Sequence, residues 1–277
     1  MTALSVLQTA RSLLFVPGNR PERFAKAGAS GASVVCIDLE DAVPPDARAK
    51  ARSDVLAFLA LQARGHIYGL RLNRLASADG LRDLLTLVER LSVRPAFVML
   101  AKTESALEVQ LLAAHLPGMA LVALIESPRG LDAAMRIAHA HPQLQALMLG
   151  GVDLCVEIGC EFAWEPLLYA RSRLLAAAAS AALLAIDVPW LDVADSEGAR
   201  AESARVAALG FAAKALIHPS QVAPVHSGLA PTPEALARAQ RIVAAAGADD
   251  AAVLLDGRLI DRPVVLAAAQ LLRRAGL

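Results

Sequence analysis

The sequence predicts a (β/α)₈ barrel, a closed ring of eight parallel strands with a helix after each one. Short apolar segments recur along the chain, each is followed by a stretch with helical spacing, and no hairpin signal interrupts this series. The chain has 277 residues, of which 56% are hydrophobic and 19% charged, so it can bury a core of barrel size.

The predicted strands have the length and apolar character of strands that are buried on both faces of a parallel sheet. A doubly wound open sheet is the alternative, but it would usually carry a glycine-rich phosphate turn after its first strand. The segment at that place reads VPGNRPERF, which is not a dinucleotide fingerprint. In chain order, the predicted strands are 12–16, 33–38, 67–72, 96–100, 121–126, 146–150, 183–188 and 214–219.

The alternation of strand and helix stops near residue 225, so we predict a barrel over 1–225 and an extension over 226–277. In the extension, a helix begins after Thr232 and stops at Gly247, a hairpin turns at 256–257, and a last helix follows. The extension is too short for an independent core. We therefore expect it to pack on a barrel, its own or a neighbour's, as a lid and oligomerisation segment.

Composition and charge exclude several classes of function. Lysine and arginine number 27, aspartate and glutamate 27, and aromatic residues make up 4%, which leaves no case for nucleic-acid binding. The most apolar stretch, 174–186, is shorter than a bilayer needs, and no signal peptide is expected, so we predict a cytoplasmic protein without a membrane span. Three cysteines without a metal pattern are predicted to be reduced: Cys36, Cys155 and Cys160.

The stretch 121–154 carries the candidate metal site. Two apolar strands, joined by a helical segment, each stop at a carboxylate, Glu126 and Asp153. Neighbouring parallel strands lie roughly 5 Å apart, so both carboxylates could share one cation. Mg²⁺ is usually held by one or two carboxylates, with water and substrate completing its coordination. We therefore predict a Mg²⁺ site at these two residues.

Further polar residues follow the other strands, where barrel enzymes place their chemistry. Arg71 is a candidate clamp for an anion, because a guanidinium matches a carboxylate in shape; the less favoured alternative is a structural pair with an acid such as Glu40. Asp38, Glu40 and Asp41 would give one ion too much negative charge. We predict that they orient the waters of the metal and Arg71, or else that they hold the following loop.

Lys102 allows a different chemistry. A barrel lysine can form a Schiff base with a ketone if its pKa is lowered. Glu104 and Glu126 are close in the predicted arrangement and would keep this amine charged, which favours an ion pair. His218, before a proline, is interpreted as a packing residue rather than a base.

The motifs at the predicted strand ends resemble those of the citrate lyase beta-subunit family, which includes the malyl-CoA and citramalyl-CoA lyases and belongs to the HpcH/HpaI aldolase superfamily. The resemblance covers nearly the whole chain, and its motifs occur in the order RSLLFVPGN, DLEDAV, LRLN, LIESPRGL, GGVDL, YARSRL, GFAAKALIHPSQV and DGRLIDRP. It implies a Mg²⁺-dependent barrel that cleaves or forms a carbon–carbon bond next to a thioester. A 3-hydroxyacyl thioester such as citryl-, malyl- or citramalyl-CoA would yield an acetyl thioester and a 2-oxo acid.

The resemblance also implies roles for individual residues. Glu126 and Asp153 match metal ligands, and Glu126 would lie beside the substrate. Asp261 matches a catalytic aspartate that reaches into a neighbouring subunit, which implies a homo-oligomer; a trimer is our preferred state. By its position, Asp261 could instead simply cap the last helix. The substrate-binding matches are Arg71, which would also stabilise the enolate, Phe15 near CoA, Lys26 at the CoA phosphates, and the backbone at Ile186 and Asp187.

The sequence leaves several functions open. The thioester could be carried by CoA or by a carrier protein, as in a citryl-carrier lyase subunit of a larger complex. A malyl-CoA thioesterase would use the same substrates, and a Schiff-base aldolase would act through Lys102. A catalytically idle barrel that serves only in assembly is disfavoured, because the set of Arg71, Glu126, Asp153 and Asp261 is intact.

Overall fold

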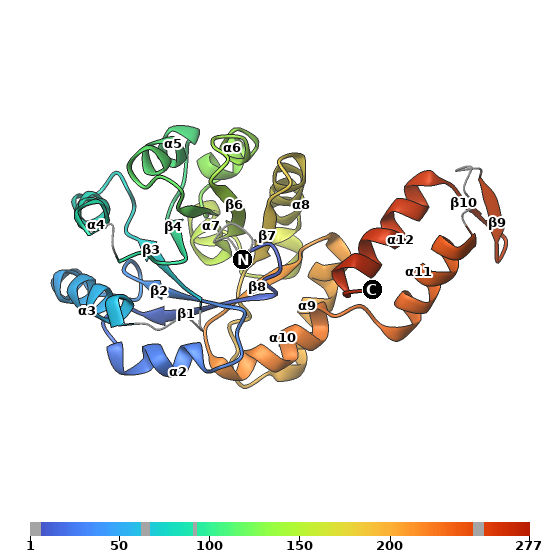
Figure 1. Cartoon of the computed structure of the whole chain (residues 1–277), viewed down its shortest axis with the longest axis horizontal. Coiled ribbons are helices and arrows are strands. Elements are labelled where there is room, and N and C mark those ends of the chain that lie inside the picture. Colours follow the sequence, from blue (N-terminus) through green and yellow to red (C-terminus); the bar gives the residue numbers. More distant parts are fainter. Residues whose placement is uncertain (1–6, 62–66, 91–92, 246–251) are drawn as a thin grey trace.

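The predicted barrel is confirmed in the computed structural model, which describes residues 7–61, 67–90, 93–245 and 252–277. Eight parallel strands close into a ring in chain order, and helices surround the ring (Figure 1). Each predicted strand agrees with an observed one to within about two residues at both ends, except that the last was predicted to end at 219 and ends at Leu216. The strands are β1 Ser12–Pro17, β2 Val34–Asp38, β3 Tyr68–Leu72, β4 Phe97–Leu100, β5 Ala120–Ile125, β6 Leu144–Leu149, β7 Leu184–Asp187 and β8 Ala213–Leu216.

Helices connect the strands, and serine caps begin several of them. The hydroxyl oxygen of Ser77 accepts from Gly80 N at 3.0 Å and that of Ser127 from Gly130 N at 3.0 Å. Short 3₁₀ turns lie at Pro21–Arg23 (η1), Pro45–Ala47 (η2) and Pro219–Gln221 (η3). The barrel helices are α2 Phe24–Gly28, α3 Arg48–Leu61, α4 Ala78–Glu89, α5 Ala106–His115, α6 Pro128–Ala138, α7 Gly151–Ile158, α8 Trp164–Ser180, α9 Ser196–Leu209 and α10 Val222–Leu229.

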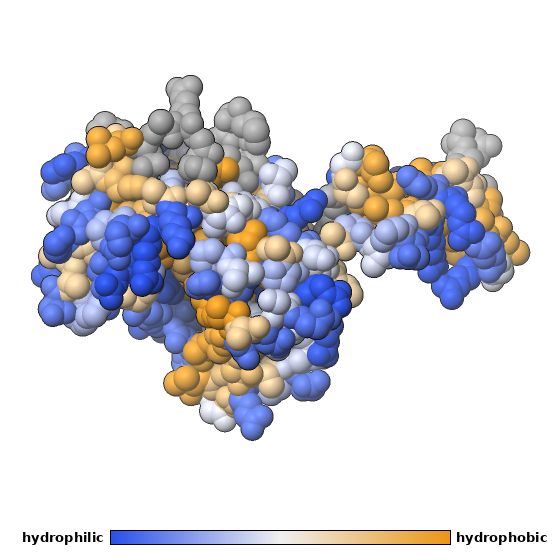
Figure 2. Space-filling model, turned by 90° about the horizontal axis from the view of Figure 1, so that it is seen from below, coloured by the Kyte–Doolittle hydropathy of each residue, from blue (hydrophilic) through white to orange (hydrophobic). Residues whose placement is uncertain are grey.

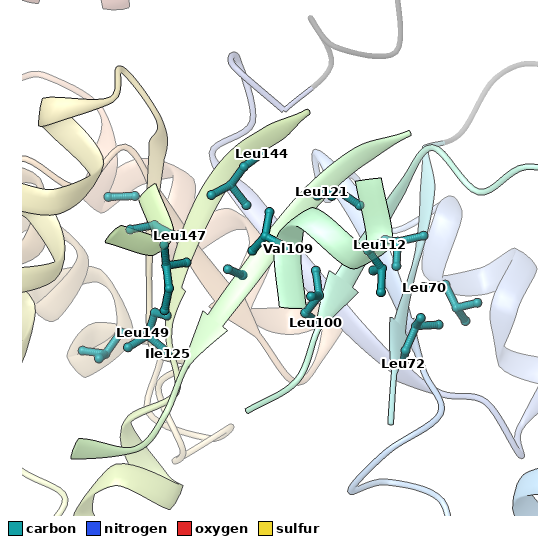
Figure 3. Packing of buried hydrophobic residues seen from close by; sticks show 14 of the residues in the cluster. Leu70, Leu72, Leu100, Val109, Leu112, Leu121, Ile125, Leu144, Leu147 and Leu149 are labelled. Atoms are coloured by element: carbon teal, nitrogen blue, oxygen red, sulfur yellow. The ribbon is translucent and has the colours of Figure 1, made fainter. Parts of the chain in front are cut away.

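The core has two layers, because successive side chains of a strand point to opposite faces. One layer lies between the strands and the surrounding helices and contains Leu121, Leu147 and Val109, among the residues shown in Figure 3. The other fills the interior of the barrel and includes Phe97 and the amino-terminal Leu7. Burial of both faces explains why the strands read as continuous apolar runs.

The predicted neighbours β5 and β6 are paired and parallel. Their last paired residues are Ile125 and Leu149, so the residues that follow each strand lie side by side at the carboxyl end of the barrel. In the same way, Asp38 pairs with Arg71 across β2 and β3. The closed sheet therefore gathers the predicted polar residues at one mouth.

The extension forms the predicted helix–hairpin–helix, with α11 at Pro233–Ala245, β9 at Val253–Leu255, β10 at Arg258–Ile260 and α12 at Arg262–Arg274. Asp256 and Gly257 have φ of +50° and +71°, as expected for the predicted two-residue turn. The Thr232 hydroxyl accepts from Ala235 N at 3.2 Å, as predicted for a cap. Gly247 lies outside the described residues.

The predicted boundary at residue 225 falls inside α10, which packs against α9. His226, beyond that boundary, places Nε2 2.8 Å from the hydroxyl oxygen of Ser12 in β1. We therefore place the end of the barrel unit at Leu229 and treat the residues from 230 onward as the extension.

The extension stands apart from its own barrel (Figure 1). It exposes apolar surface (Figure 2). Its own small core contains Ala239, Ile242, Ile260 and Ala268. The remaining apolar side chains include Leu254 at 77% exposed and Leu259 at 62%. Among the described residues, none of the helices has the length and apolar character that crossing a bilayer requires.

Candidate active site

Arg71 is the centre of an ion-pair cluster at the carboxyl end of the barrel. Its Nε and Nη2 donate to the two oxygens of Asp38, each at 2.6 Å, which makes a bidentate pair between neighbouring strands. Its Nη1 faces two more acids, Glu40 Oε2 at 3.0 Å and Asp41 Oδ2 at 3.4 Å. Asp38 also accepts from the backbone of Glu40 at 2.9 Å, which fixes the loop after β2. The acids therefore hold Arg71 and the loop, while the orientation of metal-bound waters stays a prediction.

Lys102 follows β4 and places its ammonium among the same acids. Its Nζ lies 2.6 Å from Glu40 Oε1, 3.4 Å from Asp41 Oδ1 and 3.5 Å from Asp153 Oδ2. Burial would lower the pKa of Lys102, but the hydrogen bond and charge of Glu40 outweigh burial and raise it. The ion pair expected for Lys102 is present with different acids, because Glu104 instead binds Arg74 at 2.8 Å.

Glu126 lies immediately after β5 and is buried, at 4% exposed. Its Oε1 accepts from the backbone nitrogen of Lys102 at 2.7 Å. Lys102 presents that nitrogen from a left-handed conformation, with φ of +49°. Burial, aided by the negative charge of Glu40, raises the pKa of Glu126 to about 8. A carboxyl group with this pKa gains stability from a cation placed beside it.

Gly150 makes room for Glu126 at the end of β6. A methyl group on Gly150 would lie 2.4 Å from Glu126 Cβ and 2.7 Å from Oε2, closer than atoms can approach. Gly150 also precedes α7, whose first turn carries Asp153. The glycine therefore allows the β5 carboxylate to lie against the element that holds the second one.

Asp153 is partly exposed, but its Oδ2 is buried and has no hydrogen-bond partner in the described part of the chain. Both carboxylates face Lys102, since Glu126 Oε1 accepts from its backbone nitrogen and Asp153 Oδ2 lies 3.5 Å from its Nζ, and the negative charge of Asp153 helps to raise the pKa of Glu126. No group of three or more His, Cys, Asp or Glu within the described ranges is arranged to hold a metal. The donor set is therefore two carboxylates of the kind that suits Mg²⁺ with water and substrate as further ligands.

The cluster as a whole carries excess negative charge. Within the described residues, the ion pairs of the cluster contain two side-chain cations, Arg71 and Lys102. They face the carboxylates of Asp38, Glu40, Asp41 and Asp153, with Glu126 beside them. When all five carboxylates are ionised, a divalent cation would offset most of this imbalance. The electrostatics and the donor set both fit a bound Mg²⁺.

Phe15 and Lys26 flank the cluster. The Phe15 ring, at the end of β1, lies 5.0 Å from the guanidinium carbon of Arg71. Lys26 is exposed in the last turn of α2. The structure thus places an aromatic side chain against Arg71 and leaves the Lys26 ammonium open to solvent.

Asp187 and Ile186 are at the end of β7, but their side chains are buried. Asp187 binds Arg171 at 2.8 Å and Lys214 at 2.7 Å, and Lys214 also binds Glu202 at 2.7 Å. These pairs neutralise the Asp187 carboxylate, so only its backbone and that of Ile186 could contact a substrate. The expectation of a backbone contact is compatible with this placement.

Asp261 lies where β10 meets α12, at the end of the extension away from its own barrel (Figure 1). Its Oδ1 accepts from Val264 N at 3.3 Å, so the helix-capping role considered from the sequence is present. His218 caps η3 in a similar way, with Nδ1 3.2 Å from Ser220 N. Within one chain, neither residue belongs to the cluster around Arg71.

Sequence reasoning missed two structural supports of the site. One is Gly150, whose place in the pair Gly150–Gly151 signals close backbone approach without naming the neighbour. The other is Arg171, a charged residue in an Ala-rich helix, where a buried ion pair is the usual reason for such a residue. The backbone contact from Lys102 to Glu126 had no signal in the sequence, because it depends on an unusual φ.

The fold and the site define a class of protein, a (β/α)₈ barrel with a cluster of carboxylates at the carboxyl ends of its strands that favours a bound cation. The profile of the HpcH/HpaI aldolase/citrate lyase family matches residues 11–219. The chain belongs to this family, and the resemblance inferred from its motifs is confirmed.

Relatives of known name cover almost the whole chain. It is 37% identical over 270 residues to a citrate lyase subunit beta-like protein of Mycobacterium tuberculosis, covering 95% of this chain and 94% of that protein. It is 32% identical over 299 residues to an L-malyl-CoA/beta-methylmalyl-CoA lyase of Cereibacter sphaeroides, covering 96% and 94% respectively.

Solved structures show the same architecture. CitE of Mycobacterium tuberculosis, in complex with magnesium, acetoacetate and coenzyme A, superposes with a TM-score of 0.86 at 36% identity, covering 98% of this chain and 100% of that one. RipC of Yersinia pestis superposes with a TM-score of 0.73 at 36% identity, covering 82% and 98%. The likeness to CitE includes the extension as well as the barrel, as its coverage requires.

Proposed function

We propose that this protein is a Mg²⁺-dependent carbon–carbon lyase that splits a 3-hydroxyacyl-CoA into acetyl-CoA and a 2-oxo acid, and that it can catalyse the reverse condensation. The observation that carries the proposal is the acidic cluster, in which Glu126, just after β5, and Asp153, in the first turn of α7, both face Lys102, at 2.7 Å from its backbone nitrogen and 3.5 Å from its Nζ respectively. The names of the relatives support it, since they include a malyl-CoA lyase and a CitE complex with magnesium and coenzyme A.

Glu126 and Asp153 would hold the Mg²⁺. The buried Oδ2 of Asp153 lacks a hydrogen-bond partner in the described chain, and burial raises the pKa of Glu126, so both groups would gain from a cation. Bound there, Mg²⁺ would supply Lewis-acid polarisation of the oxygens of the 2-oxo acid half. Asp38, Glu40 and Asp41 would orient the surrounding waters and Arg71.

Arg71 would bind the thioester side of the reaction. Two of its nitrogens are fixed by Asp38, which holds the guanidinium plane in place and leaves Nη1 toward the mouth. When the 3-hydroxyl loses its proton to water and becomes the carbonyl of the 2-oxo acid, the carbon–carbon bond breaks, and its electron pair moves into the thioester and gives an enolate. A fixed cation next to the enolate oxygen stabilises that charge without having to reorganise.

The CoA would extend from this centre along the side of Phe15 and Lys26. The Phe15 ring packs against Arg71 and offers an apolar surface near the thioester. The exposed ammonium of Lys26 suits the phosphates of CoA. Backbone atoms at Ile186 and Asp187 would contact the thioester, because their side chains are buried in the barrel.

Asp261 of a neighbouring copy would transfer the proton at carbon, to the enolate in cleavage and from the acetyl methyl group in condensation. Its position at the outer end of an extension that stands off its own barrel supports action in trans. The exposed apolar side chains of the extension support burial against another subunit. We propose a closed oligomer, with a trimer as the preferred state.

Two alternative functions use the same site. The thioester could be carried by a protein, as in a citryl-carrier lyase subunit, or a malyl-CoA could be hydrolysed rather than cleaved. A Schiff-base aldolase is disfavoured, because the ion pairs of Lys102 raise its pKa and keep the amine protonated. Borohydride with substrate should therefore trap no adduct on Lys102. A cytoplasmic location is also part of the proposal, supported by three free cysteines.

The test is incubation with Mg²⁺ and a panel of malyl-, citramalyl- and citryl-CoA, with separate detection of free 2-oxo acid, acetyl-CoA and free thiol. A lyase releases 2-oxo acid and acetyl-CoA in equal amounts, and a chelator stops it. Release of thiol without 2-oxo acid would show that the protein is a thioesterase and not a lyase. Activity only on a carrier-bound citryl group would identify the complex subunit.

A further inference from the structure

A second cavity lies outside the ring of strands, and no step of the proposed reaction uses it. It occupies about 600 Å³ between α8, α9 and the loop after β7, a size that is typical of small-molecule pockets. The neighbouring helices on either side are closely packed, α6 against α8 and α9 against α10. The gap between α8 and α9 is therefore a local feature of this part of the barrel.

The walls of this cavity are largely aromatic. The chain has two tryptophans, Trp164 and Trp190, and both line the cavity. Trp190 is held firmly, since its carbonyl accepts from Gln221 Nε2 at 2.7 Å. A methyl group on Gly198 would lie 2.5 Å from Trp190 Cζ2, so the indole edge that carries Nε1 lies directly on the first turn of α9. The aromatic walls are thus fixed by packing and hydrogen bonds.

Two buried donors of this cavity lack acceptors. Arg171 is 1% exposed and uses Nε and Nη2 on Asp187, while its Nη1 has no hydrogen-bond partner in the part of the chain that the structure describes. Trp190 Nε1 is likewise buried without a partner there. Unpaired buried donors are costly, so an acceptor placed between them would stabilise the protein.

The charges that line the cavity are two arginines, Arg171 and Arg205, and two acids, Asp192 and Glu202. The guanidinium carbon of Arg205 lies 3.9 Å from the centre of the Trp164 ring, and that of Arg171 lies 4.5 Å from the same ring. Both acids already have partners, an ammonium 2.7 Å from Glu202 and a backbone nitrogen 2.9 Å from Asp192. Arg205 has no ion pair among the described residues, so its guanidinium is available to an added anion.

We propose that this cavity binds a small organic anion that consists of one carboxylate or phosphate group on a flat apolar body. The anionic group would accept from Arg171 Nη1 and Trp190 Nε1 and pair with Arg205. The flat body would lie against the two indole rings. This site shares no side chain with the acidic cluster at the mouth.

The tryptophans provide a direct measurement, since the chain has no others. Tryptophan emission, excited where a phenyl group does not absorb, would be followed during titration with 3-phenylpropionate, 3-phenylpropionamide and 2-phenylethyl phosphate. We expect saturable change with an anion, and binding of the neutral amide about tenfold or more weakly. The relative affinity of carboxylate and phosphate then identifies the anionic group.

Variants locate the binding. Arg205→Gln and Trp190→Phe should each weaken binding of the preferred anion by about tenfold. Arg200→Gln is the matched control, because Arg200 is exposed on the same helix and pairs with Glu197. Equal affinity for the anion and the amide would overturn the proposal. Unchanged affinity in both variants would also overturn it. An emission change that depends on protein concentration and not on added anion would overturn it too, because it would show that another copy of the chain fills the cavity.

Discussion

Glu126 is an acidic residue in an environment that disfavours its charged form. Burial raises its pKa from 4.5 to about 8, so between these values the folded protein holds a proton that the unfolded chain releases. Without a bound cation, the free energy of unfolding should therefore fall as pH rises through this window, by about 1.4 kcal/mol per pH unit at most. A cation at the carboxylate would reverse this trend.

Replacing Glu126 with Gln should remove that slope. In a chelator, Glu126→Gln should be more stable than the parent at pH 8 and similar to it near pH 5, because the amide resembles the protonated acid. Urea unfolding across this range measures the effect. Glu157→Gln, at an exposed position of α7, is the control and should retain the parental slope. A parental slope in Glu126→Gln would show that another group titrates.

Arg71 depends on its shape as well as its charge. Arg71→Lys cannot reproduce the bidentate pair with Asp38 while also facing Glu40. We expect kcat/KM to fall by about 100-fold or more, since a misplaced cation stabilises the developing negative charge poorly. Arg74→Lys is the control, because Arg74 is half-exposed and bound to Glu104. Near-normal kcat/KM for Arg71→Lys would show that Arg71 acts through its positive charge alone and not through its shape.

At the scale of the elements, the candidate metal site depends on the junction of β5, β6 and α7. Gly150→Ala would place a methyl group 2.4 Å from Glu126 Cβ. We expect the free energy of unfolding to fall by about 1–3 kcal/mol and Mg²⁺ affinity to drop about tenfold, because the carboxylate must move. Denaturant unfolding and calorimetry measure the two effects.

The control for this change lies at the other end of α7. Gly159 has φ of +79° and open space around its Cβ position. Gly159→Ala should cost about 1 kcal/mol in stability through backbone strain while leaving Mg²⁺ affinity unchanged. If Gly150→Ala also left the affinity unchanged, the glycine would serve packing alone.

The elements were predictable because each strand is apolar on both faces and each follows a helix in regular alternation. The pair of Glu126 and Asp153 was predictable for the same reason, since neighbouring parallel strands bring their ends together. The detailed partners were not. Lys102 was expected near Glu104 and Glu126; its backbone nitrogen does bind Glu126, but its ammonium binds Glu40 and not Glu104.

Boundaries and buried ion pairs depend on packing that one sequence does not display. Helix α10 has the composition of a linker helix, yet it packs on α9, which moves the end of the barrel to Leu229. Asp187 resembles a site carboxylate from its place at a strand end. Arg171, distant in sequence, neutralises it inside the wall of the barrel. Such long-range pairs become visible only once the helices are placed.

At the scale of the whole molecule, we propose that the extension packs on a neighbouring copy of the chain. It stands apart from its own barrel (Figure 1), has a small core and exposes Leu254 and Leu259. If its Asp261 completes a neighbour's site, Asp261→Ala and Glu126→Ala should each be inactive. Unfolded together and reassembled, they should regain part of the activity, because some interfaces then pair an intact barrel with an intact extension.

The control mixes each variant with itself and should give no activity. Native mass spectrometry would verify that mixed oligomers have formed. Mixed oligomers without activity would show that Asp261 serves its own barrel or only caps α12, as its hydrogen bond to Val264 allows.

The central claim is that Glu126 and Asp153 together hold one Mg²⁺ for chemistry at the barrel mouth. The most direct measurement is calorimetric titration of Mg²⁺, in the presence of pyruvate as a 2-oxo acid, into the parent, Glu126→Ala and Asp153→Ala. We expect one ion per chain in the parent and loss of that binding in both variants, with unchanged circular dichroism showing that the variants are folded. Unchanged Mg²⁺ affinity in both variants would contradict it.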